Sequence, residues 1–112
     1  MSELRKLTIE FLKVLADPIR LDILYLLEKN KFSSSEIQEE LKRSQSTISK
    51  HLNMLVENDL IDFEKIDNIK YYKIENNEVF DLINTTNTIV LNNSKKKLRD
   101  IQDADIHDIL SP

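Results

Sequence analysis

Residues 33–59 decide the fold of this chain, and they read SSSEIQEELKRSQSTISKHLNMLVEND. Near their start, Ile37 and Leu41 lie four residues apart and therefore share one face of a helix. The basic pair at 42–43 interrupts this pattern, and Ser44 follows with a hydroxyl that can accept a backbone N–H as an N-cap. The stretch predicts two short helices joined by a tight turn.

The second helix, expected over residues 45–57, has one apolar and one polar side. The apolar residues fall within an arc of about 100° on a helix, and they are Ile48, Leu52, Leu55 and Val56. The opposite side carries Ser46, Thr47, Lys50, Asn53 and Met54. Hydrogen-bonding side chains at the start of a helix with an apolar back suit the major groove of DNA. We therefore expect a recognition helix here.

Capping residues predict further helices on either side of this turn. Apolar residues at three- and four-residue intervals favour a helix over 4–16, and Asp17 then caps a helix over 18–29 that begins with proline. This next helix is apolar almost all round, which is typical of a helix at the centre of a core. Ser33 and Glu36 have the spacing of a capping box at the start of the helix that follows.

The second half of the chain changes from a helical to an alternating pattern and back. Residues 61–66 and 69–74 alternate in polarity and predict two strands, with Asp67-Asn68 as a two-residue hairpin turn. Residues 77–101 return to helical spacing, although their many Asn and Thr residues give a weak intrinsic propensity. The order α-α-α-α-β-β-α predicts a mainly α protein with a small β-hairpin, which is a winged helix-turn-helix.

Length and charge bound the organisation of the chain. At 112 residues it is expected to form one domain over 1–102, followed by an acidic C-terminal tail over 103–112. His107 and the aspartates beside it could bind a divalent cation, but a solvated tail is the simpler interpretation. A domain of this size has a modest core, so a second copy could add much of the buried area.

The composition excludes several classes of site. The chain has no cysteine, which excludes disulfides, thiolate zinc sites and thiol redox switches. It has no glycine, which excludes a Gly-rich phosphate loop and leaves turns to Asn and similar residues. Catalysis is not expected, because two histidines and no recognisable carboxylate pair offer little chemistry. Neither a membrane span nor a signal peptide is visible, so we expect a cytoplasmic protein.

The net charge of −4 is unusual for a protein that binds DNA. The distribution of the charges is more favourable for DNA binding than their sum. The acidic residues of the first helix of the pair precede the turn, whereas the cations near the expected groove face are Lys42, Arg43 and Lys50. Two copies of this patch would create a local positive stripe, and DNA affinity should then fall strongly with salt.

Three runs in the expected order resemble the ArsR family of bacterial and archaeal repressors. They are LADPIRLDIL at 15–24, SQSTISKHL at 44–52 and YYKI at 71–74, and the similarity covers roughly residues 12–83. The resemblance implies a homodimer that packs through its first and last helices and binds a palindromic operator. It also implies groove contacts from Ser46, Thr47, Ser49, Lys50 and their neighbours, a hairpin along the flanking backbone or minor groove, and release of DNA by a metal, metalloid or other signal.

The sequence departs from this family at the positions that sense metals. The cysteine pair of the family falls on Ser33 and Ser35, whose hydroxyls cannot supply the thiolate ligands that soft metals select. A second family site on the last helix matches Asn76, Glu78, Ile89 and Asn92, which do not form a ligand set. We therefore expect no metal site and no cofactor, and we leave the effector open.

The sequence thus predicts a dimeric transcriptional regulator, acting as a repressor on double-stranded DNA. Groove contacts are expected from Gln45, Ser46, Thr47, Ser49, Lys50 and Asn53. Backbone contacts are expected from Lys42, Arg43, His51, Lys65, Lys70 and Lys73, with a packing role for His51 as the alternative. Arg20 could equally form an internal ion pair or touch DNA. Two other functions stay open: a winged-helix protein-interaction module, which the acidic charge favours, and a constitutive DNA-binding protein without an effector.

Overall fold

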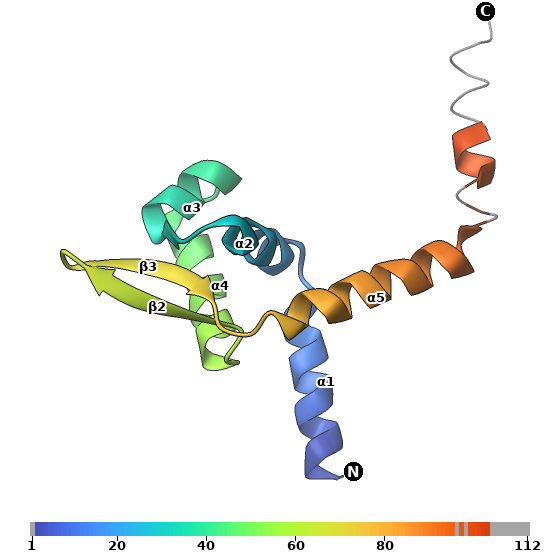
Figure 1. The fold of residues 1–112 in the computed structure, drawn as a ribbon, viewed down its shortest axis with the longest axis horizontal. Coiled ribbons are helices and arrows are strands. Elements are labelled where there is room, and N and C mark those ends of the chain that lie inside the picture. The colour runs from blue at the N-terminus through green and yellow to red at the C-terminus, as the bar shows by residue number, and fades with distance from the viewer. Residues whose placement is uncertain (1, 96, 98, 104–112) are drawn as a thin grey trace, which may run out of the picture. The chain divides into compact units, whose positions relative to one another are not determined.

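The computed structural model describes residues 2–95, 97 and 99–103. The chain divides into two compact units, Met1–Asn76 and Asn77–Pro112, and each is described by itself. Figure 1 shows the elements of the two units. The first unit contains α1 (Glu3–Leu15), α2 (Pro18–Lys29), β1 (Phe32–Ser33), α3 (Ser34–Leu41), α4 (Gln45–Glu57), β2 (Ile61–Ile66) and β3 (Ile69–Ile74), and the second contains α5 (Glu78–Asn93).

The helices of the first unit begin where the capping residues predict. Asp17 accepts the backbone N–H groups of Ile19 and Arg20 at 2.9 and 3.0 Å, and α2 starts at the proline that follows Asp17. The predicted capping box of α3 is confirmed, because the Ser33 hydroxyl accepts the Glu36 N–H while the Glu36 carboxylate accepts the Ser33 N–H. Side-chain caps of this kind stabilise a helix by about 0.5–2 kcal/mol each.

The core of the first unit is built around α2, which packs against α3, α4 and β3. The fully buried side chains are Ile23, Leu24, Ile37, Ile48, Leu52, Leu55 and Ile61. Burying one such side chain contributes about 1.5–3 kcal/mol relative to leaving it exposed. The predicted central place of the second helix is thus confirmed, as is most of the buried arc of α4, although Val56 is only half-buried.

The hairpin β2–β3 forms with the predicted strands and turn. Asp67 and Asn68 both have positive φ, 52° and 66°, as a type I′ hairpin turn requires. Figure 1 shows this hairpin extending from the helices of the first unit with its turn at the far end. We call the hairpin the wing.

The sheet has one strand more than the sequence indicated. β1 pairs antiparallel with β3, placing Phe32 opposite Tyr72, so the strand order is β1-β3-β2. A two-residue strand has no alternation to detect, and it forms because the outer edge of β3 still has unpaired backbone groups. This strand attaches the start of α3 to the base of the wing.

The second unit begins with α5, of which only the first turns are buried. Val79, Phe80 and Ile83 are the buried residues, whereas the later part exposes large apolar side chains. The helix ends at Asn93 with Ser94 as its C-cap, and residues 99–103 are helical again. The continuous helix predicted to residue 101 is therefore interrupted, at a run of Asn and Ser with low helix propensity. The predicted acidic tail lies outside the described residues beyond residue 103.

Candidate nucleic-acid interface

The turn between α3 and α4 presents two cations. Lys42 ends α3 in the left-handed conformation, with φ of 54° and ψ of 48°, and its backbone N–H bonds to the Gln38 carbonyl. The Arg43 N–H bonds to the same carbonyl at 3.1 Å. Glycine usually occupies this kind of position, and in a chain without glycine a lysine takes it. Both basic side chains of the turn are exposed, as the prediction of backbone contacts requires.

The N-terminus of α4 forms a cluster of hydroxyl groups. The Ser44 hydroxyl accepts the Thr47 N–H at 3.3 Å, and it also lies 3.0 Å from the Thr47 hydroxyl and 3.3 Å from that of Ser46. The first turn of α4 contains no acidic residue. Because backbone N–H groups and the helix dipole make a helix N-terminus favourable for anions, this end suits a phosphate.

The predicted groove residues of α4 lie on its accessible side. Four of them are exposed, namely Gln45, Ser46, Lys50 and Asn53, and two are half-buried, namely Thr47 and Ser49. They come from successive turns of one helix and offer hydroxyl, amide and ammonium groups. Such groups can donate to and accept from base edges in the major groove.

The strand register divides the predicted lysines of the wing into two groups. Lys65 lies opposite Lys70, and Lys70 holds its ammonium 4.4 Å from the centre of the Phe63 ring. Like charges directly opposite each other destabilise an antiparallel pair of strands, so a nearby anion would stabilise this pair of lysines. A DNA phosphate is such an anion.

Lys73 lies on the other face of the wing and contacts a carboxylate. Its ammonium is 3.9 Å from Glu64, which also accepts a hydrogen bond from Lys31. That hydrogen bond lowers the pKa of Glu64 below its usual value, and the charges of both lysines act in the same direction. The predicted DNA contact of Lys73 therefore competes with an ion pair inside the protein.

His51 is placed differently from the expectation that it contacts phosphate. Its side chain belongs to the buried face of α4 and is 6% exposed. Its Nδ1 lies 3.1 Å from Nη1 of Arg20, whose other nitrogens donate to carbonyls of Val14 and Lys13. Of the two roles expected for this residue, phosphate contact or packing, the geometry supports packing.

Arg20 is the residue whose role the sequence left undecided. It lies 4.0 Å from Asp17 and its side chain is 11% exposed, so the internal ion pair is the interpretation that the structure supports. The run LADPIRLDIL contains both residues, but the partner in α4 comes from 31 positions further along the chain. Only the packing of α2 against α4 brings the two together.

The pKa values of His51 and Asp17, which both lie near Arg20, are shifted. Burial lowers the pKa of His51 below its usual 6.5; the charge of Asp17 opposes this, and those of Arg20 and Lys50 add to it. Burial alone would raise the pKa of Asp17, but hydrogen bonds from backbone N–H groups and the charges of Arg20 and His51 lower it below 3.8. Both shifts favour a neutral imidazole beside an ionised carboxylate.

Of the two serines that match the family's sensor positions, Ser33 has a structural use. Ser33 is buried and caps α3, whereas Ser35 is exposed in the first turn of the same helix. Among residues 2–95, 97 and 99–103, no three His, Cys, Asp or Glu side chains gather closely enough to hold a metal ion. None of the described helices has the length and apolar content needed to cross a bilayer.

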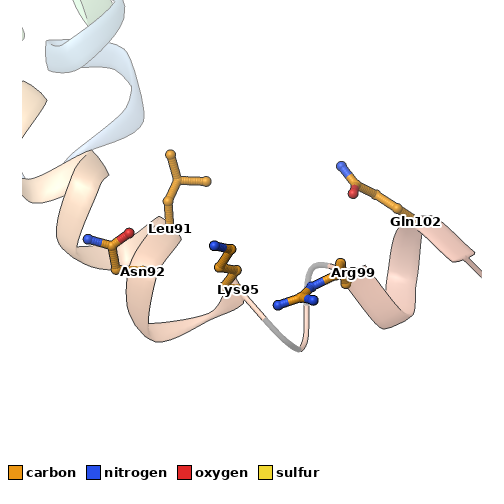
Figure 2. Close-up of a pocket in the computed structure, with 5 residues that line it drawn as sticks. All are labelled: Leu91, Asn92, Lys95, Arg99 and Gln102. Carbon is orange, nitrogen blue, oxygen red and sulfur yellow. The ribbon is translucent and has the colours of Figure 1, made fainter.

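A hollow of about 420 Å³ occurs in the second unit, lined by Leu91, Asn92, Lys95, Arg99 and Gln102. Figure 2 shows these side chains along α5 and the helical residues that follow it. The lining residues are two cations, two amides and one leucine, which do not identify a ligand. We assign no function to this hollow.

Comparisons with known proteins agree with the geometry. The sequence model described as bacterial regulatory protein, arsR family, matches residues 17–62. The arsenical resistance operon repressor of Staphylococcus xylosus is 40% identical over 79 residues, covering 70% of this chain and 75% of that protein. The repressor of the same name from Staphylococcus aureus is 31% identical over 94 residues, covering 84% of this chain and 90% of that protein.

Solved structures share the fold. HlyU from Vibrio cholerae has 29% sequence identity and a TM-score of 0.67, over 80% of this chain and 97% of that chain. Sequence and fold thus agree over the helix-turn-helix, the part of the chain whose exposed side chains suit DNA. The chain belongs to the ArsR family of winged helix-turn-helix transcriptional regulators, which bind DNA.

Proposed function

We propose that this regulator is a homodimeric repressor that binds a palindromic operator, with α4 in the major groove. The observation that carries the proposal is the accessible start of α4, where hydroxyl and amide side chains surround a helix N-terminus without acidic residues. The exposed cations of the preceding turn, Lys42 and Arg43, are placed next to that end and supply phosphate contacts.

The wing adds backbone contacts beside the groove. Lys65 and Lys70 share one face of the hairpin and are both exposed, so they are the wing residues that we assign to phosphate. Lys73 contributes less, because Glu64 already neutralises it in part. The wing therefore positions the protein on the duplex, whereas α4 reads the bases.

Exposed apolar side chains support a dimer. On α1, Leu4 is 75% exposed, and Leu7 and Leu12 are about half-exposed. On α5, Ile89, Val90 and Leu91 are each more than half-exposed. Apolar faces of this kind mark protein interaction sites on a soluble domain, and a second copy of the chain would cover them. Both recognition helices would then meet one face of the DNA about 34–36 Å apart.

Footprinting on the DNA that flanks the chain's own gene tests the proposal. At about 50 mM salt, where phosphate contacts are strong, we expect two protected segments about 10–10.5 base pairs apart and related by two-fold symmetry. A single protected segment would contradict the dimer. Absence of protection under these conditions, with a folded protein, would contradict operator binding and favour the protein-interaction module.

A further inference from the structure

One side chain, Arg20, joins the end of α1 to the middle of α4. Its Nε donates to the carbonyl oxygen of Val14 and its Nη2 donates to that of Lys13 at 3.3 Å. Both carbonyls belong to the last turn of α1, where the helix dipole favours a cation. The remaining arm, Nη1, lies 3.1 Å from Nδ1 of His51 on α4. The guanidinium therefore connects three helices, because Arg20 itself belongs to α2.

This contact fixes the protonation state of His51. A guanidinium has only donors and stays charged, so the ring nitrogen that faces it must accept and the imidazole proton must lie on Nε2. Protonation of the ring would replace a hydrogen bond with two facing cations in a site where the ring is 6% exposed. The charged groups that act on the ring are Asp17 and Arg20 from the start of α2 and Lys50 from α4 itself. The helix α3 and the strand β2 also pack against α4, but among the described residues neither contributes a charged group that acts on the ring.

We propose that Arg20 and His51 are positioning residues for the recognition helix, and that DNA binds tightly only while His51 is neutral. The proposal rests on DNA binding by α4. Lys50 precedes His51 on that helix and Asn53 lies two residues beyond it, and both are exposed on the groove side. A binding site loses contacts when its supporting shell lets it move by a fraction of an ångström to about 1 Å. Loosening α4 from α1 and α2 would thus lower affinity without removing any side chain that touches DNA.

The pH dependence of DNA affinity tests this proposal, with the footprinted upstream duplex as the probe. Acid normally strengthens DNA binding because it makes a protein more positive. We expect the opposite here. Relative to pH 7.5, affinity falls about fivefold or more at pH 5.0, because protonation of the ring becomes more favourable as the pH falls toward the lowered pKa of His51. A fivefold change is the lower end of typical coupling effects. His51→Asn places a permanently neutral acceptor near the Nδ1 position, so its own affinity should not fall between these two pH values.

The other histidine of the chain provides the matched control. His107→Asn removes the same chemical group at a position outside the described residues, and it should keep the acid loss of the wild type. An equal acid loss in His51→Asn would overturn the proposal, and so would a wild-type affinity that stays constant or rises at pH 5.0. Melting of each variant at both pH values shows that the compared proteins are folded.

Imidazole nitrogen NMR on the free protein gives a second readout that needs no DNA. At pH 7.5 we expect the Nε2–H tautomer for His51. Arg20→Met should raise the pKa of His51, because the guanidinium charge disfavours the imidazolium. A proton on Nδ1 at pH 7.5, or an unchanged pKa in Arg20→Met, would overturn the contact itself. Failure of footprinting with this NMR result intact would instead reject the operator proposal alone.

A double-variant comparison separates positioning from general stability. His51→Ala removes the acceptor that His51→Asn keeps, so it is the variant for this comparison. If Arg20 acts on DNA binding through His51, the affinity loss of Arg20→Met with His51→Ala should be no larger than that of the more damaging single variant, since residues in one contact are not additive. Fully additive losses would show that the two residues act independently, which contradicts the proposal.

Discussion

The helix-turn-helix and the wing both carry cations that we assign to DNA, but these cations are held differently. On the wing, Lys73 pairs with Glu64 and Lys70 sits over the Phe63 ring. At the turn before α4, Lys42 and Arg43 stand exposed beside a helix N-terminus. The difference indicates that an acidic chain can still bind DNA when a few accessible cations are placed at one helix end. We therefore propose that the wing orients the protein more than it attracts the duplex.

The largest effect should come from the buried face of α4. Leu52 is 1% exposed, so Leu52→Ala should lower the free energy of unfolding by about 2–5 kcal/mol through lost burial and a cavity. Urea denaturation measures this loss. Asn53→Ala, one residue along on the exposed face, is the matched control and should change stability by no more than about 0.5 kcal/mol. Similar losses in both variants would show that the two faces are assigned wrongly.

Salt dependence tests the comparison between the cations of the helix-turn-helix and those of the wing. The double variant Lys42→Ala/Arg43→Ala should lower the slope of log affinity against log salt by about 2, one for each phosphate contact. The double variant Lys65→Ala/Lys70→Ala should lower it by the same amount or less, and Lys73→Ala should hardly change it. Titrations at several salt concentrations provide the slopes. A larger change in slope for Lys73→Ala than for Lys42→Ala/Arg43→Ala would contradict the expected order of these variants.

A smaller effect is expected at the cap that starts α2. Asp17→Ala should cost about 0.5–2 kcal/mol at neutral pH, because two backbone N–H groups lose their acceptor. The folded-state pKa of Asp17 lies below 3.8, so its contribution is present above that pH and is lost as the pH falls through the folded value. The stability difference between wild type and variant should therefore shrink in acid. A difference that grows below pH 3.8 would contradict this assignment.

The smallest effect is expected at the wing turn. Asn68→Gly relieves a left-handed non-glycine residue in the type I′ turn and should stabilise the protein by up to about 1 kcal/mol. DNA affinity should stay unchanged, because no assigned contact is altered. Thermal unfolding detects the change, and a destabilised variant would argue against the hairpin geometry. Ser94→Gly, outside the wing, serves as a comparison at a residue with negative φ, where no gain is expected.

The parts of the fold that the sequence predicts are those coded by local signals. Asp17 and Ser44 mark helix starts by their side-chain acceptors, and Asp67-Asn68 marks the hairpin turn by its tolerance of positive φ. β1 is too short for any local signal, since its pairing depends on the distant edge of β3. The break after Asn93 lies in a stretch whose weak helix propensity the sequence shows, but the apolar spacing continues across it and does not mark where the helix ends.

The candidate DNA interface, like the fold, is predictable where local signals determine it. Exposed polar residues of α4 follow from helical periodicity, which is why the groove residues lie on the accessible side. His51 lies at the border between the two sides of the helix, and periodicity alone does not decide its direction. Its burial depends on Arg20, a residue of another helix, so only the assembled fold reveals that role.

The most direct test of the account compares two exposed lysines in operator binding. Lys50 lies on the groove side of α4, whereas Lys29 ends α2 outside both the helix-turn-helix and the wing. We predict that Lys50→Ala weakens binding to the footprinted duplex by about tenfold, within the range of one base contact, and that Lys29→Ala changes it by less than about twofold. Equal effects of the two substitutions, or none from Lys50→Ala, would contradict the claim that α4 is the helix that reads DNA.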